Sequence, residues 1–136
     1  MLWNFYSPVD SDTLKCFEDT FDFHINPPLR DFLLTYNGGK TRQCTIPTSV
    51  RERRMEAILD FSDEENTYSI NRRMRRLLGN KIIVIGTDRS GNFLCVQRDL
   101  RKQEFVIWNH ITNTLEPCAL EIPVILMYWQ NQTERT

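Results

Sequence analysis

The side chains best suited to acid–base chemistry near neutral pH are His24 and His110. His24 lies between Phe23 and Ile25, and His110 follows Trp108 and Asn109. Neither belongs to an H-x-x-x-H or H-E-x-x-H pattern, which would place metal ligands on one helix face. We interpret both as structural histidines and predict no catalytic residue and no metal site. A small hydrolase or nucleic-acid enzyme is the least favoured hypothesis, because it needs a histidine beside carboxylates in a pocket.

A short glycine pair raises the question of phosphate binding. Residues 38–41 (GGKT) match the end of a P-loop, but the upstream glycine is missing and the segment follows a predicted helix instead of a strand. A G-x-S-x-G nucleophile motif is also absent from the sequence. We therefore predict no cofactor.

Arginines gather in two places that could suit nucleic acid. These clusters consist of Arg51, Arg53, Arg54, and of Arg72, Arg73, Arg75, Arg76. The simpler interpretation is a solvated surface, helped in the second cluster by cations near a helix C-terminus. The whole chain carries 17 basic and 18 acidic residues, a net charge of -1, so no general field attracts nucleic acid. We predict no nucleic-acid partner and leave the role of the clusters open.

Cysteine usage and apolar runs indicate the compartment. Cys16, Cys44, Cys95 and Cys118 are widely separated, without C-x-x-C spacing, and lie beside apolar residues. This pattern favours buried free thiols in a reducing compartment over disulfides or a metal site. The N-terminus lacks the basic and apolar regions of a signal peptide, and no apolar run approaches the ~18 residues of a membrane span. We expect a cytoplasmic protein with no membrane partner.

Acidic side chains are the strongest candidates for contact with a protein partner. Residues 1–37 hold six acids against two bases. The candidates fall on a predicted first helix and after a predicted strand: Glu18, Asp19, Asp22, Asp60, Asp63, Glu64, Glu65. Solvated surface or helix caps are the structural interpretation. The functional one is a surface complementary to lysines and arginines of a basic partner, with charge setting encounter rate and register.

The elements that must position these residues follow from periodicity and turn signals. A first helix begins near Asp10 or Ser11, and a second begins at Pro27 and ends at Asn37. On the strand at residues 55–61, alternation places Met55, Ala57 and Leu59 on one face. The remaining predicted elements are strands at residues 44–47, 81–86, 92–97 and 103–109, and helices at residues 66–78 and 120–131.

Three successive strands joined by short turns form an antiparallel meander, with helices before and after it. The predicted class is therefore α+β with segregated elements. The 136 residues, of which 40% are hydrophobic and 26% charged, suit one domain spanning residues 1–136.

Three segments together resemble a known family. Residues 29–39 (LRDFLLTYNGG) resemble the helix-ending YxxFLxxxNGG motif of the SUKH superfamily, also called the Smi/Knr type. Residues 83–96 (IVIGTDRSGNFLCV) resemble its ixIGxDxxGNxxCl hairpin, and residues 105–110 (FVIWNH) its VxxWdH strand. The order and spacing of the segments agree with the family over about residues 10–130.

This resemblance implies a strongly curved antiparallel sheet beside helices and a non-enzymatic, protein-binding role. It implies an immunity protein that neutralises a cognate toxin domain, such as a nuclease or deaminase, by direct contact. The alternative it leaves open is a regulatory or scaffold module with an endogenous partner. The resemblance does not identify the toxin or decide between a monomer and a weak dimer.

Overall fold

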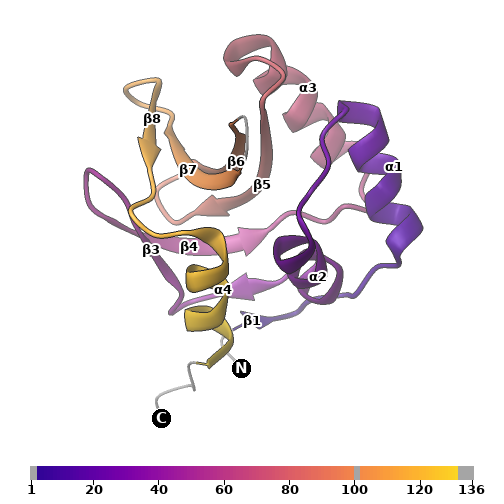
Figure 1. Cartoon of the computed structure of the whole chain (residues 1–136), viewed down its shortest axis with the longest axis horizontal. Coiled ribbons are helices and arrows are strands. Elements are labelled where there is room, and N and C mark those ends of the chain that lie inside the picture. The colour runs from indigo at the N-terminus through magenta and orange to yellow at the C-terminus, as the bar shows by residue number, and fades with distance from the viewer. Residues whose placement is uncertain (1–2, 100–101, 132–136) are drawn as a thin grey trace.

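The computed structural model describes residues 3–99 and 102–131. Within these residues lie four helices and eight antiparallel strands, and the sheet is not closed (Figure 1). The predicted α+β class with a curved central antiparallel sheet is confirmed. No helix within the described ranges is long and apolar enough to cross a membrane.

Helix boundaries agree with the local sequence signals. The helices are α1 (Ser11–Phe21), α2 (Pro27–Tyr36), α3 (Asn66–Leu78) and α4 (Ile122–Asn131). Asp10 caps α1, because its Oδ1 accepts a hydrogen bond of 2.8 Å from the backbone N of Thr13. Pro27 occupies the first turn of α2, where its missing N–H costs nothing.

The strands pair in the order β1-β2-β4-β5-β6-β7-β8, and β3 pairs with β4 beside β2. Their bounds are β1 (Trp3–Asn4), β2 (Lys40–Thr41), β3 (Thr45–Pro47), β4 (Glu52–Ile58), β5 (Ile82–Asp88), β6 (Phe93–Arg98), β7 (Gln103–Asn109) and β8 (Thr114–Pro117). The predicted meander corresponds to β5, β6 and β7.

The sheet curls so far that β8 returns to the β3–β4 hairpin (Figure 1). The backbone N of Ser49 donates to the carbonyl O of Pro117 at 2.9 Å, and Thr48 forms an antiparallel bridge with Cys118. Register shifts in β4 and β5 support the bend. At the second, a Cβ on Gly86 would lie 2.6 Å from a backbone oxygen, so the close approach of the strands requires glycine there.

Several sequence predictions about strands were wrong. Strands β1, β2 and β8 were not predicted, because they have two to four residues and too few for a period-2 pattern. Strand β4 was predicted at residues 55–61, but it spans Glu52–Ile58. Its bulge also changes the predicted alternation, because Ile58 is buried in the same core as Met55 whereas Ala57 is half-buried.

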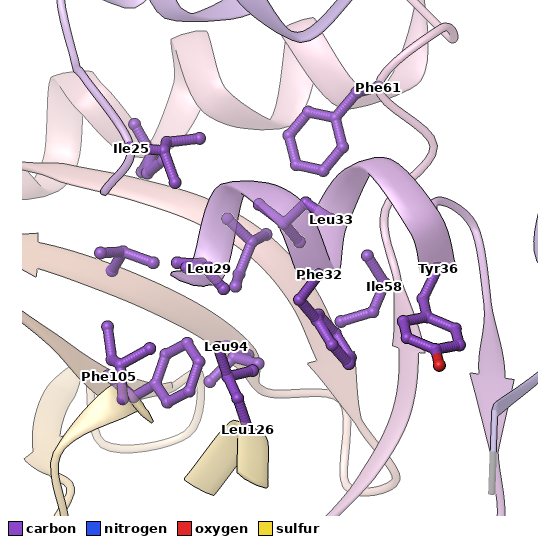
Figure 2. Packing of buried hydrophobic residues seen from close by; sticks show 14 of the residues in the cluster. Ile25, Leu29, Phe32, Leu33, Tyr36, Ile58, Phe61, Leu94, Phe105 and Leu126 are labelled. Carbon is purple, nitrogen blue, oxygen red and sulfur yellow. The ribbon is translucent and has the colours of Figure 1, made fainter. Parts of the chain in front are cut away.

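Two hydrophobic clusters cover the two faces of the sheet. The larger lies between the sheet and α1, α2 and α4, and the smaller packs Met74 of α3 against Val84, Cys95 and Val106. Figure 2 shows the apolar face of α2 directed towards side chains of the sheet and of α4. The labelled residues of the larger cluster are Ile25, Leu29, Phe32, Leu33, Tyr36, Ile58, Phe61, Leu94, Phe105 and Leu126.

The cysteine predictions hold only in part. All four cysteines are free thiols, and Cys44 and Cys95 are buried as expected. Cys118 is half-buried, and Cys16 is exposed on α1, so the prediction of a buried Cys16 was wrong. The apolar neighbour Phe17 is one residue along the helix and faces the core, which leaves position 16 on the solvent side.

Candidate protein-binding surface

The two histidines lie on separate elements and have structural contacts. His24 follows α1 with its side chain 76% exposed, and its Nδ1 lies 3.4 Å from an Oε of Glu18. His110 lies between β7 and β8, and its Nδ1 lies 2.7 Å from Oδ1 of Asn92. Across residues 3–99 and 102–131, no group of three His, Cys, Asp or Glu side chains could hold a metal ion.

The β5–β6 turn is held by side chains from the hairpin motif. Oδ1 of Asp88 accepts hydrogen bonds from the backbone N of Ser90 at 2.9 Å and of Asn92 at 2.8 Å. Oδ1 of Asn92 in turn accepts one of 3.1 Å from the backbone N of His110. Both Asp88 and Asn92 are buried, so this part of the motif builds the scaffold.

Asn37 performs the same task after α2. Its Oδ1 accepts a hydrogen bond of 2.7 Å from the backbone N of Phe61, and its Nδ2 donates to Oδ1 of Asp60 at 2.8 Å. A further bond of 3.1 Å joins its Nδ2 to the carbonyl O of Ser7. One buried amide thereby ties the end of α2 to the chain before α1 and after β4.

The structure gives Glu18 an internal role. Its side chain is 8% exposed, and its carboxylate accepts hydrogen bonds from the backbone N of Ile25 at 2.8 Å and from Nε of Arg30 at 3.1 Å. Because both oxygens are occupied inside the protein, Glu18 joins α1 to α2. We therefore leave it out of the proposed contact surface.

Asp60 and Asp63 also serve the local backbone. Oδ1 of Asp60 accepts hydrogen bonds from Ser62 and Asn37. Burial raises the pKa of Asp60, but these hydrogen bonds outweigh burial, so the pKa is lowered. Oδ1 of Asp63 accepts a bond of 3.0 Å from the backbone N of Asn66, which lowers the pKa of Asp63 and caps the first turn of α3. Both carboxylates are therefore anionic, with their hydrogen bonds directed inward.

The other four predicted carboxylates, Asp19, Asp22, Glu64 and Glu65, are exposed. Asp19 forms an exposed ion pair of 3.1 Å with Lys15, and Asp22 ends α1 in the left-handed conformation with φ 48°. Such an exposed pair contributes little to stability, so it constrains the surface weakly.

Tyr68 packs the first turn of α3 against α1. Its ring meets that of Phe17 edge-on at 5.5 Å between centroids. Burial, the thiol of Cys16 and the charge of Glu64 together raise the pKa of Tyr68 to about 12. Glu64 therefore lies close to Tyr68, whereas Asp19 and Asp22 line a shallow pocket with Lys15, His24 and Arg30.

The arginine clusters divide between structural and exposed positions. Arg53 is buried in an ion pair with Glu116, and Nη1 of Arg75 donates to the carbonyl O of Phe21 at 2.8 Å. The guanidinium of Arg72 lies 5.9 Å from the ring centroid of Tyr68. Arg51, Arg54, Arg73 and Arg76 are exposed. Neither cluster forms an unbroken basic surface, because its members face different environments.

A further candidate was missed from sequence. A groove of about 600 Å³ opens where several segments of chain meet, and its walls are Asn4, Phe5, Lys40, Thr41, Arg42, Glu56 and Arg89. Its cations come from β2, the loop after it and the β5–β6 turn. Sequence reasoning could not group these side chains, because only the curled sheet brings them together. The sole sequence signal for this groove was the apolar Phe5, beside short strands that had not been predicted.

The fold and contacts define an α+β domain built on buried turn motifs. The chain matches the model of the SMI1 / KNR4 family (SUKH-1) over residues 8–121, and it belongs to this family. The predicted family membership is confirmed. The search of curated proteins found no match.

Proposed function

We propose that this chain is an immunity protein that binds a cognate toxin domain in the cytoplasm and neutralises it by direct contact. The match to the SUKH-1 family over residues 8–121 is the observation that carries the proposal. The function needs shape and charge, not reactive groups, which agrees with histidines in structural contacts and motif residues committed to turns.

The proposed contact is the acidic surface formed by Asp19, Asp22, Glu64 and Glu65. All four side chains are exposed. Asp19 and Asp22 lie on α1 and at its end, and Glu64 and Glu65 lie just before α3, which packs on α1 through Phe17 and Tyr68. A basic toxin surface would be attracted to them, and complementary charge raises association rates above those of neutral partners. Asp60 and Asp63 support this surface by fixing the turn between β4 and α3.

Charge reversal at the acidic surface tests the contact. Glu64→Lys with Glu65→Lys leaves the Asp63 cap intact, so folding is preserved. We expect the association rate with the toxin domain encoded beside this gene to fall by about tenfold at low salt, and by less at high salt. The measurement is surface-based binding kinetics at several ionic strengths.

The matched control reverses Asp31 and Glu121, which are exposed acids on other elements. This variant has the same net charge, so any difference from the first variant reports position. Equal rates for both variants would remove the acidic surface from the proposal. Failure of the full chain to bind or inhibit the toxin would remove the immunity function itself.

The alternative function is a regulatory or scaffold module acting on an endogenous protein. The match to the SMI1 / KNR4 family (SUKH-1) is compatible with this module as well as with an immunity protein. Co-purification separates the two functions. Recovery of the neighbouring toxin with loss of its activity supports the immunity protein, whereas repeated recovery of one housekeeping protein with no toxin supports the module.

A further inference from the structure

The residue at the mouth of the groove has an unusual conformation. Phe5 has φ 58° and is 86% exposed. A bulky side chain in the left-handed region is strained, and an exposed aromatic ring recovers none of that cost by burial. A non-glycine residue held in this way points to a functional role when its surroundings fix it.

The residues on either side of Phe5 hold its backbone in this conformation. Trp3 is buried and meets Phe32 edge-on at 5.6 Å, and Tyr6 meets Tyr36 edge-on at 5.1 Å. The backbone N of Ser7 also donates to the carbonyl O of Asn37 at 2.8 Å. Contacts on both sides of Phe5 hold the backbone in place, so its ring is presented to solvent in a defined position.

The groove beside Phe5 carries excess positive charge. Lys40, Arg42 and Arg89 line it with one carboxylate, that of Glu56. Within residues 3–99 and 102–131, no carboxylate lies within 4.0 Å of the charged nitrogens of these three cations. Nη2 of Arg89 donates to the carbonyl O of Arg42 at 3.2 Å, which fixes the wall of the groove.

We propose that this groove is a second protein-binding site, in which Lys40, Arg42 and Arg89 accept an acidic segment of a partner and Phe5 anchors in that partner's apolar surface. The site goes beyond the proposed function, because it lies on β1, β2 and the β5–β6 turn and uses charge of the opposite sign. Unpaired cations attract carboxylates, and a pre-positioned aromatic side chain loses little entropy on binding.

A protein partner fits the groove better than a nucleic acid does. Glu56 would repel a phosphate backbone that follows the groove, whereas a peptide can place a basic or neutral residue there. The net charge of -1 also supplies no general attraction to phosphate. Base stacking on Phe5 is the competing interpretation, and the test includes it.

The test selects ligands without assuming a sequence. A library of short random peptides is selected on the full chain, with counter-selection on the double variant Lys40→Glu and Arg42→Glu. We expect enriched peptides to combine Asp or Glu with a neighbouring apolar residue, and to lose at least about tenfold in affinity for Phe5→Gly, as hot-spot residues do. Fluorescence anisotropy measures the affinities.

Phe5→Gly is informative because glycine adopts positive φ without strain, so the melting temperature should not fall. Phe5→Asn provides a second variant with a residue that tolerates this conformation. Ile111→Gly is the matched control, since Ile111 is 82% exposed and lies outside the groove. We expect this control to bind enriched peptides as the parent chain does.

Three outcomes would overturn the proposal. The first is enriched peptides without an acidic excess, or with equal affinity for the charge-reversed variant. The second is tighter binding of a short oligothymidylate than of any enriched peptide, with loss of that binding in Phe5→Gly. The third is selection of no groove-dependent peptide at all. None of these results bears on the toxin contact, whose test uses different residues.

Discussion

The buried ion pair between Arg53 and Glu116 offers the sharpest test of how the curled sheet is held. Nε of Arg53 donates to Oε1 of Glu116 at 2.8 Å, and its Nη2 donates to Oε2 at 2.5 Å. Residue exposure is 8% for Arg53 and 2% for Glu116. Thr48 and Asn109 each donate a further bond of 3.2 Å to the same carboxylate. The pair joins β4 to β8, which are separated in the sheet by three strands.

Glu116→Gln keeps the shape but leaves the guanidinium of Arg53 buried without its counter-charge. An arginine does not lose its proton, so the whole penalty falls on the folded state. Removing one partner of a buried pair costs about 3–5 kcal/mol, out of a typical total stability of about 5–15 kcal/mol. Urea unfolding followed by far-UV circular dichroism measures the loss. Glu52→Gln, an exposed change on β4, is the control, with an expected effect within about 0.5 kcal/mol.

The double variant Arg53→Met and Glu116→Leu removes both charges, so it should be less destabilised than Glu116→Gln alone.

The ion pair between Arg53 and Glu116 also predicts that stability depends on pH. The hydrogen bond from Arg53 outweighs burial and lowers the pKa of Glu116 below its ordinary value of 4.5. The stabilisation is therefore fully present above about pH 4.5 and is lost as pH falls through the lowered pKa. A loss below about 1 kcal/mol for Glu116→Gln, or a double variant at least as destabilised as Glu116→Gln, would refute this reasoning.

Three further predictions follow from local geometry. Asn37→Ala removes the acceptor of the buried backbone N of Phe61, so it should lower the free energy of unfolding, measured by urea titration, by about 1–3 kcal/mol. Gly86→Ala should also destabilise by about 1–3 kcal/mol, because the new Cβ would lie 2.6 Å from the carbonyl O of Ala57. A chromogenic thiol reagent should modify exposed Cys16 in the native protein but Cys95 only after unfolding, since burial raises the pKa of Cys95 to about 12.

Each of these predictions has a matched control and a contradicting result. Gly79→Ala is the control for backbone crowding, because a Cβ there meets nothing within 4 Å and only its φ of 90° disfavours alanine. A loss below about 0.5 kcal/mol for Gly86→Ala would contradict the close approach at Gly86. Asn37→Asp keeps the acceptor for the backbone N of Phe61 but replaces the donor to Asp60 with a second buried carboxylate, so it should lose more stability than Asn37→Ala. Labelling of Cys95 at the rate of Cys16 would contradict its burial.

The fold class and the family followed from sequence because they depend on strong local signals. Asn37 and Gly38 end a helix, and Gly91 supplies the φ of 84° that its turn needs. Strands β5 to β7 are six or seven residues long, and each contains a run of four apolar residues. Strands β1, β2 and β8 carry no such signal, because their identity comes from pairing with distant partners. The pattern of β4 failed for a related reason, since its bulge appears only in its pairing with β5.

The candidate surface was predicted less completely than the fold. Sequence identified the acidic segments, but charge alone could not separate an internal carboxylate such as Glu18 from exposed ones such as Glu64 and Glu65. That distinction depends on Arg30 and the backbone N of Ile25, which approach Glu18 only after α2 packs against α1. The groove beside Phe5 could not be predicted from the sequence, because only the complete sheet brings its walls together.

The return of β8 to the β3–β4 hairpin also reduces the length of strand edge that the sheet leaves uncovered. An uncovered strand edge offers backbone donors and acceptors to any other chain. Here β3 ends at Pro47 and β8 at Pro117, residues that lack a backbone donor, and the residues after them, Thr48 and Cys118, bridge the two strands. An open sheet in which β8 meets β3 in this way exposes less strand edge to other chains than a flat open sheet does. At the opposite end of the sheet, β1 pairs with β2, where the charged Lys40 lies opposite Asn4.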